Sequence, residues 1–366
     1  MRKLERDRIT SMGNELVSII IPLYNAKKYI SDCMECVTGQ TYRNLEILLI
    51  NDGSNDGSEK LCKSYMEKDE RIRYFYKNNG GAASARNLGI MQARGKYLYF
   101  MDIDDILEKD AIELMYHIYQ KHNVDLVIGN VKHISIYGDA TSEWIDKDTK
   151  FENKDAVREL IYAFANDMKS YKMLYCAWGK LYRTDIVKEN AICFNEKICT
   201  HEDNVFLIEY IACCNSAYYI GKCLYVYRHY RQKDSDNESY SNTGYLAGPL
   251  DFEYVVREVK KILVEKKYNR VISNFYSEYA IIIMFHCVRL LNGHSVHEIR
   301  RLYSIIYQIV NKGHGGGVKR AIQYYVQKHD DNAKWIPFFI KRGWIWLIII
   351  TFKLQIRNLE RRNRKK

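Results

Sequence analysis

Three aspartates, Asp102, Asp104 and Asp105, directly follow a run of aromatic and aliphatic residues at 97–101. Such a run predicts a short buried strand. Carboxylates that gather at the end of a core strand repel one another unless positive charge joins them, and a divalent cation that prefers oxygen ligands is the simplest partner. The structural alternative, that one aspartate caps a helix expected from Leu107 to His122, accounts for one of the three. The cluster therefore predicts a metal or phosphate site.

Two other segments have residues suited to a nucleotide. Asp52 follows a second apolar run in a glycine-rich turn, where a carboxylate accepts hydrogen bonds from a base or a ribose. The segment 80–87 has small residues at an expected helix start, which favours phosphate binding, and Arg86 is suited to pair with phosphates. The alternatives are helix capping by Ser54 or Asp56 and tight helix–sheet packing of the small residues.

Glu202 and Asp203 are the candidates for a catalytic base. They stand on an expected turn before an apolar helix at 205–212. A hydroxyl group is a poor nucleophile, so transfer to a hydroxyl needs a carboxylate base on the far side of the reacting carbon. The structural alternative is a pair of acids that complements the dipole of the helix.

The elements that must position these residues follow from the hydrophobic pattern. Apolar runs predict strands at 16–22, 45–50, 72–76, 97–101 and 124–131, with helical patterns between them. This alternation predicts an α/β fold with a parallel sheet and helices on its faces. Ligands of such sheets bind at the carboxyl ends of the strands, where the polar residues fall. Further along, 218–230 suggests one or two strands, and helical patterns dominate at 249–265, 271–292, 297–311 and 317–328.

Composition limits the class of protein. The chain has 366 residues, 47% hydrophobic and 28% charged, which is typical of a globular protein with a catalytic domain and a second part. Its ten cysteines are scattered in apolar runs, so we interpret them as reduced thiols in a reducing compartment. The N-terminus has no signal-peptide pattern. The net charge of +11 is concentrated at the chain end, and no nucleic-acid recognition motif is present, so no nucleic-acid partner is expected.

The C-terminal segment 335–366 differs from the rest of the chain. It is largely apolar up to residue 356, with Lys341 and Arg342 as interruptions, and it ends in a basic run. Its uninterrupted apolar part, 343–352, is too short to span a bilayer. Tryptophans and cations beside an apolar helix predict peripheral attachment to an anionic membrane surface. A core helix with a solvated basic end and an RNA-binding tail are the alternatives.

Six motifs, in this order, resemble those of the family-2 glycosyltransferases over roughly residues 16–230. They are Val17–Asn25, Asn51–Ser58, Ala83–Gly89, Met101–Asp105, Trp178–Tyr182 and His201–Phe206. The resemblance implies a GT-A-type, Rossmann-like fold with a mixed, mainly parallel sheet and an inverting single displacement from a nucleotide-diphospho-sugar, with a UDP-sugar favoured. It also implies Mn²⁺ or Mg²⁺ as the cofactor.

The resemblance assigns roles to residues. Asp52 would contact the nucleotide base, and Arg86 would lie near the phosphates. Asp102 would contact ribose or metal, and Asp104 the metal. Asp203 would be the base, supported by Glu202. The remaining sugar-donor-binding candidates are Pro22, Tyr24, Asn25, Ser54, Ala83 and Asn87. Candidates for contact with the acceptor or the diphosphate are Trp178, Lys180, Arg228, His229 and Arg231.

The sequence thus predicts four parts: a polar extension at 1–15, a catalytic domain at 16–235, a helical acceptor or accessory region at 245–330, and the membrane-associating segment 335–366. The expected enzyme builds polysaccharide on a glycan or lipid-linked glycan acceptor at the inner face of the cell membrane, and a homo-oligomer is left open. One rival is a phosphatase or phosphotransferase of the haloacid-dehalogenase type that uses Asp102 and Asp104. Another is a non-catalytic sugar-binding relative.

Overall fold

The computed structural model describes residues 14–135, 138–142, 147–157, 159–160, 176–198, 201–228, 249–265, 280–281, 284, 288, 296–311 and 335–363. The chain divides into two compact units. The first comprises Met1–Arg158, Tyr175–Glu196 and Glu209–His229, and the second comprises Glu159–Leu174, Lys197–Ile208 and Tyr230–Lys366. The predicted catalytic domain thus contributes residues 197–208, with both candidate base residues, to the second unit.

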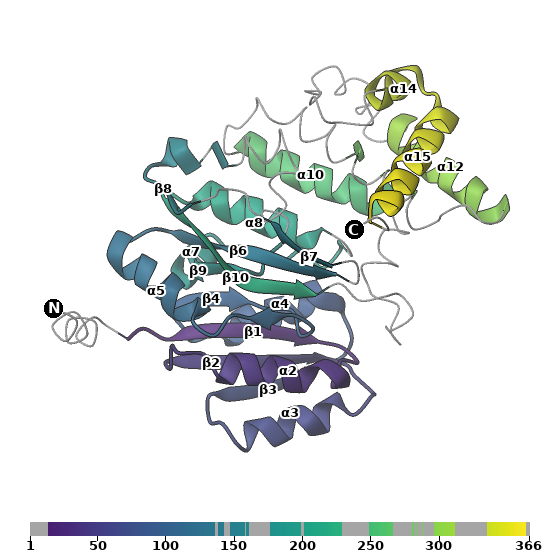
Figure 1. Cartoon of the computed structure of the whole chain (residues 1–366). Coiled ribbons are helices and arrows are strands. Elements are labelled where there is room, and N and C mark those ends of the chain that lie inside the picture. Colours follow the sequence, from purple (N-terminus) through teal and green to yellow (C-terminus); the bar gives the residue numbers. More distant parts are fainter. Residues whose placement is uncertain are drawn as a thin grey trace. The chain divides into compact units, whose positions relative to one another are not determined.

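A ten-stranded sheet forms the first unit, in the order β3-β2-β1-β4-β9-β6-β10-β5, with β7 paired to β6 and β8 paired to β10 (Figure 1). The predicted strands correspond to β1 (Val17–Leu23), β2 (Leu45–Asp52), β3 (Ile72–Lys77), β4 (Tyr97–Phe100) and β6 (Leu126–Ser135). β10 (Ala217–Arg228) corresponds to the one or two strands expected at 218–230. The strands added to these are β5 (Ile106–Leu107), β7 (Gly138–Ser142), β8 (Thr149–Phe151) and β9 (Lys180–Arg183).

The sheet is mixed and mainly parallel, which confirms the predicted fold class. β3, β2, β1 and β4 pair in parallel, and so do β6 and β10. Between these groups lies β9, which is antiparallel to both β4 and β6. Because β9 is antiparallel to both of its neighbours, the two parallel groups run in the same direction.

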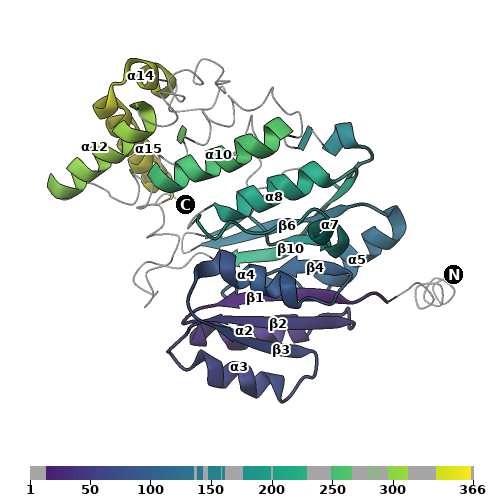
Figure 2. The ribbon, with the colours of Figure 1, turned by 180° about the vertical axis from the view of Figure 1, so that it is seen from behind.

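Helices cover both faces of this sheet. α2 (Lys27–Thr38), α3 (Ser58–Met66) and α5 (Ala111–His122) pack on one face, where Ile30, Cys62 and Met115 join the β1 residues Val17 and Ile19 in the core. α4 (Gly81–Gln92) packs on the other face, against β1 and β2 (Figure 2). A Cβ atom at Gly89 of α4 would lie 2.3 Å from Ile20 Cγ2, so close packing requires glycine there.

One helix boundary was predicted wrongly. The helix expected from Leu107 begins at Ala111, because Ile106 and Leu107 form the short strand β5 and pair with Val226 and Tyr225 of β10. A two-residue strand has no periodicity of its own, so only its distant partner defines it.

The second unit is helical in its described part. It contains the start of α8 (Glu202–Cys213), α10 (Pro249–Glu265), α12 (Val296–Asn311), α14 (Ile336–Arg342) and α15 (Ile345–Asn363). α10 and α12 confirm two predicted helices. Of the helix predicted at 271–292, only residues 280–281, 284 and 288 are described, and these are helical. The helix predicted at 317–328 lies outside the described residues, and so do residues 1–13 of the predicted N-terminal extension.

A buried carboxylate joins the parallel strands to one another. Glu46 on β2 accepts hydrogen bonds from Ser18 Oγ on β1, from the N–H groups of Arg94 and Gly95, and from Arg73 on β3 at 2.8 Å. Burial by itself would raise the pKa of Glu46, but the hydrogen bonds from Ser18, Arg94 and Arg73 and the charge of Arg73 lower it overall. The ionised carboxylate is therefore the stabilising form.

We expect the substitution Glu46→Gln to lower the free energy of unfolding at pH 7 by about 3 kcal/mol, because it leaves Arg73 with a partly buried and unmatched charge. A folded-state pKa below the unfolded value of about 4.3 means that this stabilisation is present at neutral pH and fades as the pH falls below about 4. Urea unfolding at pH 7 and pH 3 measures both effects. The control is Glu59→Gln, which breaks an exposed pair with Lys63 and is expected to cost under about 0.5 kcal/mol. Equal losses in the two variants would contradict the prediction.

Candidate active site at the carboxyl ends of β2 and β4

The carboxyl ends of β1, β2 and β4 lie at one edge of the sheet, because these strands are parallel neighbours. Asp52 is the last residue of β2, Tyr24 follows β1, and Asp102 lies two residues beyond β4. The topology thus brings together the strand ends that the sequence pattern placed at one edge. Tyr24 is 42% exposed there.

Asp52 is buried and holds the start of α4. Its Oδ1 accepts hydrogen bonds from Lys77 Nζ at 2.6 Å and from the Gly80 N–H at 2.9 Å, and its Oδ2 accepts one from the Gly81 N–H at 2.7 Å. Gly81 has a φ of +86°, a conformation that favours glycine. A carboxylate has about four acceptor positions, so three are used within the chain. The predicted contact with a nucleotide base stays a prediction.

The loops after β1 and β2 bind each other. Asn25, with a φ of 45°, donates its N–H to Ser54 Oγ at 2.9 Å and accepts the Asn55 N–H on its Oδ1 at 2.9 Å. Asp56 accepts the N–H of Lys27, the first residue of α2. These contacts satisfy backbone groups at the start of α2, which its own turns leave unpaired. Asn25 and Ser54 therefore shape this edge of the site.

Arg86 and Asp102, two residues predicted to bind the sugar donor, form an ion pair. Arg86 Nη2 lies 3.0 Å from Asp102 Oδ1, with side-chain exposures of 6% and 28%. The Arg86 guanidinium also lies 5.3 Å over the ring of Phe194. The pair is largely removed from water, so Arg86 orients Asp102 and adds positive charge beside the carboxylates.

Asp104 is a carboxylate in surroundings that disfavour its charged form. Burial, followed by the neighbouring charge of Asp102, raises its pKa to about 6. A divalent cation between Asp102 and Asp104 would offset this repulsion with the oxygen ligands that Mn²⁺ and Mg²⁺ accept, so the donor set fits such an ion. Within the described residues, no group of three or more His, Cys, Asp or Glu side chains could hold a metal ion.

Asp105 does not cap a helix, contrary to one sequence-based interpretation. It is fully buried, and its Oδ2 accepts the Tyr225 hydroxyl at 2.7 Å while its Oδ1 accepts the Arg228 N–H at 2.9 Å. Tyr225 also accepts the Asp102 N–H at 3.2 Å. Burial and the charges of Asp104 and Asp102 raise the pKa of Asp105. Asp105 thus fixes the aspartate loop to β10, a role that sequence reasoning missed.

Arg228 closes the same loop from the β10 side. Its guanidinium donates hydrogen bonds to the Asp104 carbonyl oxygen and, at 2.9 Å, to Asp32 Oδ2 on α2. Its predicted contact with a diphosphate stays a prediction. His229 and Arg231, predicted alongside it, lie outside the described residues.

Trp178 and Lys180 are turned into the fold. Trp178 is 5% exposed and stacks on Tyr225 with ring centroids 4.6 Å apart. Lys180 is 1% exposed, and its Nζ donates to the carbonyl oxygens of Cys176 and Trp178 at 2.7 and 3.2 Å. Both side chains are engaged in shaping this loop, and their predicted contact with acceptor or diphosphate is untested.

Asn87 joins α4 to a distant loop. Its amide accepts the Phe194 N–H at 2.8 Å and donates to the Phe194 carbonyl at 2.9 Å and to Glu196 Oε1 at 3.0 Å. Phe194 is the ring beneath Arg86, so Asn87 positions it. Of the other candidates, Ala83 is buried and Pro22 is half-buried.

Glu202 and Asp203 lie in the first turn of α8, and not on a turn before it as expected. Both side chains are half-buried. His201 precedes them with a φ of 66°, and its Nδ1 lies 3.3 Å from Asn204 Nδ2. The two acids belong to the second unit, and their action together with Asp102 and Asp104 stays a prediction.

Comparisons with known proteins identify relatives of the first part of the chain. The profile of the family described as "Glycosyl transferase family 2" matches residues 18–178. Glycosyltransferase GlyA of Streptococcus pneumoniae is 31% identical over 225 residues, 59% of this chain and 31% of GlyA. Uncharacterized glycosyltransferase EpsJ of Bacillus subtilis is 29% identical over 214 residues, 58% of this chain and 61% of EpsJ. The matched regions thus span about a third to three fifths of these relatives.

Solved structures support the fold. S. aureus TarS 1-349 in complex with UDP-GlcNAc superposes with a TM-score of 0.67 at 18% identity, covering 94% of this chain and 92% of that one. The complex of the same protein with UDP gives a TM-score of 0.64. At this level of identity the similarity concerns the fold.

Proposed function

We propose that this chain, whose residues 18–178 belong to glycosyl transferase family 2, moves a sugar from a nucleotide-diphospho-sugar to a hydroxyl group of a glycan or lipid-linked glycan. The observation that carries the proposal is the cluster after β4, in which Asp102 pairs with Arg86 and Asp104 is buried beside it. One cation and two carboxylates suit a diphosphate that shares a divalent metal ion with the protein. A UDP-sugar is favoured, because TarS, which is similar in fold, was solved with UDP and with UDP-GlcNAc.

In the proposed reaction, Asp203 takes the proton of the acceptor hydroxyl with support from Glu202. The hydroxyl oxygen then bonds to the sugar carbon as the bond from that carbon to the diphosphate breaks, which inverts the configuration. Asp102 and Asp104 are the proposed ligands of Mn²⁺ or Mg²⁺, whose charge, when bound, offsets the charge on the departing diphosphate. Arg86 orients Asp102 through their ion pair.

The reaction is assigned to polysaccharide biosynthesis, with a lipid-linked acceptor bringing it to the inner face of the cell membrane. The phosphatase alternative would make Asp102 a nucleophile, yet Asp102 is paired with Arg86 and follows the fourth strand of the chain. The family match also argues against that alternative.

Thermal unfolding with a panel of nucleotide sugars tests the proposal. A UDP-sugar at a hundredfold excess over its Kd is expected to stabilise the protein by about 2.7 kcal/mol, and to do so only with Mn²⁺ or Mg²⁺ present. ADP-ribose with Mn²⁺ controls for binding of any diphosphate. If no nucleotide sugar raises the unfolding temperature in either metal, the proposed function is wrong.

A further inference from the structure

The helix α15 is apolar on two opposite faces. Its inner face is buried within the second unit and comprises Ile345, Ile348, Ile349 and Phe352. An outer stripe comprises Leu347, Ile350 and Leu354, which are 38%, 50% and 54% exposed and follow the i, i+3, i+7 spacing of one helix face. A row of exposed apolar side chains on one helix face is typical of a surface that contacts a membrane or another molecule.

Aromatic side chains extend the outer stripe at the amino-terminal end of α15. Trp335, Phe338, Trp344 and Trp346 are between 42% and 55% exposed. α14 and α15 meet at Gly343, whose φ of 71° ends α14, while the Trp344 N–H bonds back to the Phe339 carbonyl. The Phe338 ring lies 5.6 Å from Trp344 and 6.4 Å from Trp335 between centroids, so the turn groups these three rings, while Trp346 lies 5.0 Å from Tyr303 of α12. Exposed tryptophans are typical of surfaces that contact the interface of a bilayer.

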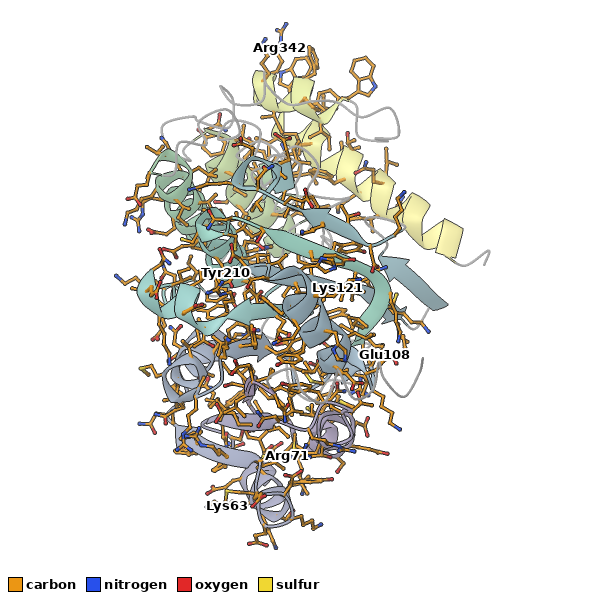
Figure 3. The ribbon with its side chains drawn as sticks, turned by 90° about the vertical axis from the view of Figure 1, so that its left-hand side faces the viewer. Lys63, Arg71, Glu108, Lys121, Tyr210 and Arg342 are labelled. Atoms are coloured by element: carbon orange, nitrogen blue, oxygen red, sulfur yellow. The ribbon has the colours of Figure 1, made fainter. Side chains whose placement is uncertain are left out.

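Basic residues flank the apolar stripe along the chain. Residues 335–366 contain nine basic residues and one acidic residue, so this segment carries a net +8 of the chain's +11. Lys341 and Arg342 end α14, and Figure 3 shows Arg342 at the outer tip with its side chain directed away from the ribbon. Arg357 is exposed on α15, one helix repeat beyond Ile350. The combination of apolar and basic residues matches an anionic lipid surface.

We propose that α14 and α15 bind an anionic membrane surface, with the outer stripe and the tryptophans inserted and the basic residues at the headgroups. Among the described residues no helix has both the length and the hydropathy to cross a bilayer, which favours a helix lying in the surface. A second copy of the chain would bring two +8 segments together, and nucleic acid would leave the aliphatic stripe uncovered. The inference goes beyond the sugar transfer and does not depend on it.

Binding of the full chain to vesicles tests the inference without any nucleotide sugar. We expect binding to phosphatidylcholine vesicles with 30% phosphatidylglycerol and weak binding to pure phosphatidylcholine. Three of the five tryptophans, Trp335, Trp344 and Trp346, lie in the proposed surface, and Trp178 is buried. Insertion is therefore expected to shift tryptophan emission to shorter wavelength and to allow quenching by brominated lipid.

Variants of α15 separate the apolar and the electrostatic contributions to vesicle binding. The triple substitution Leu347→Ser, Ile350→Ser, Leu354→Ser is expected to weaken binding at least tenfold. The pair Lys353→Gln, Arg357→Gln is expected to weaken it about 25-fold, since each basic residue near an anionic leaflet contributes about fivefold. Controls on the same unit are Val264→Ser, which changes an exposed apolar residue of α10, and Lys260→Gln with Lys261→Gln, exposed basic residues of the same helix.

Each outcome decides the inference. Equal binding of the triple variant and the Val264→Ser control would overturn it, and so would tryptophan emission that does not respond to vesicles. Concentration-dependent self-association lost only in the triple variant would assign the surface to a second copy. If circular dichroism shows that the triple variant is unfolded, Ile350→Ser alone and brominated-lipid quenching of the natural chain give the answer.

Discussion

Replacing Asp104 with asparagine is expected to lower the rate of sugar transfer by about 100- to 1,000-fold. Asp104 is one of the two proposed carboxylate ligands of the cation, and an amide lacks the charge that holds it. The substitution is expected to have the opposite effect on stability. Because burial and Asp102 raise the pKa of Asp104 to about 6, the ionised carboxylate is unfavourable in the metal-free folded protein at pH 7.5. A neutral amide of the same shape removes this cost, which is up to about 3 kcal/mol.

The gain in stability has a defined pH dependence. A folded-state pKa above the unfolded value means that the proton bound to Asp104 stabilises the fold below about pH 4, and that this stabilisation is lost as the pH rises through about 6. Urea unfolding of metal-free protein at pH 5 and pH 7.5 should therefore show a larger gain for Asp104→Asn at the higher pH. Asp110→Asn, at an exposed acid paired with Lys222, is the matched control for both measurements. Unchanged transfer and unchanged Mn²⁺ dependence in Asp104→Asn would exclude Asp104 as a ligand.

The three aspartates after β4 have different surroundings. The number of carboxylates in the sequence therefore does not say which of them is available to a ligand. Asp102 is paired with Arg86, whose guanidinium lies 3.0 Å from its Oδ1. Asp105 is used within the fold, where the Tyr225 hydroxyl and the Arg228 N–H bind both of its oxygens. Asp104 has a pKa raised by burial and by the charge of Asp102, so a cation beside it would stabilise its charged form. Asp105 fixes the loop that carries Asp102 and Asp104, the two proposed metal ligands.

The parallel strands β1 to β4 were predictable from the sequence because each is an apolar run, with at most one polar residue inside it, that ends in a turn or a polar residue. β1, β2, β3 and β4 lie within a residue or two of the predicted ranges. The strand β9 was not predicted, and β5 was read as helix. Their order in the sheet depends on pairings such as Leu107 with Tyr225, which local periodicity does not encode.

The polar residues at the strand ends were also predictable, because they follow the apolar runs directly in the sequence. The hydrogen-bond partners of their side chains were not predictable. Asp52 was expected at a ligand, yet it also holds the N–H groups of Gly80 and Gly81, 28 and 29 residues further on. Asn25 and Ser54 bind each other's loops across a similar separation. Residue type indicates that a group is a donor or an acceptor, but the fold decides which partner it meets.

Asp203→Asn is the second substitution with a large expected effect. Loss of the proposed base should lower kcat by about 100- to 10,000-fold, because the acceptor hydroxyl then lacks a proton acceptor in the transition state. Binding of the nucleotide sugar should be unchanged, since the proposed sugar-donor site is built from α4 and the ends of β2 and β4. Asparagine keeps the shape of the side chain in the first turn of α8 and removes only its charge, which costs about 0.3–1 kcal/mol of helix stabilisation.

Steady-state transfer and thermal shift with the UDP-sugar separate these effects in one protein preparation. Glu202→Gln is the neighbouring control, because it removes the same charge from the same helix turn and is expected to reduce kcat less. A purely structural role for the two acids, as partners of the helix dipole, predicts small and similar effects of both substitutions on kcat and on stability. If Asp203 is the base, Asp203→Asn should lower kcat far more than Glu202→Gln does, and the thermal shift on sugar-donor binding should stay the same. Transfer at the natural rate by Asp203→Asn would show that Asp203 is not the base.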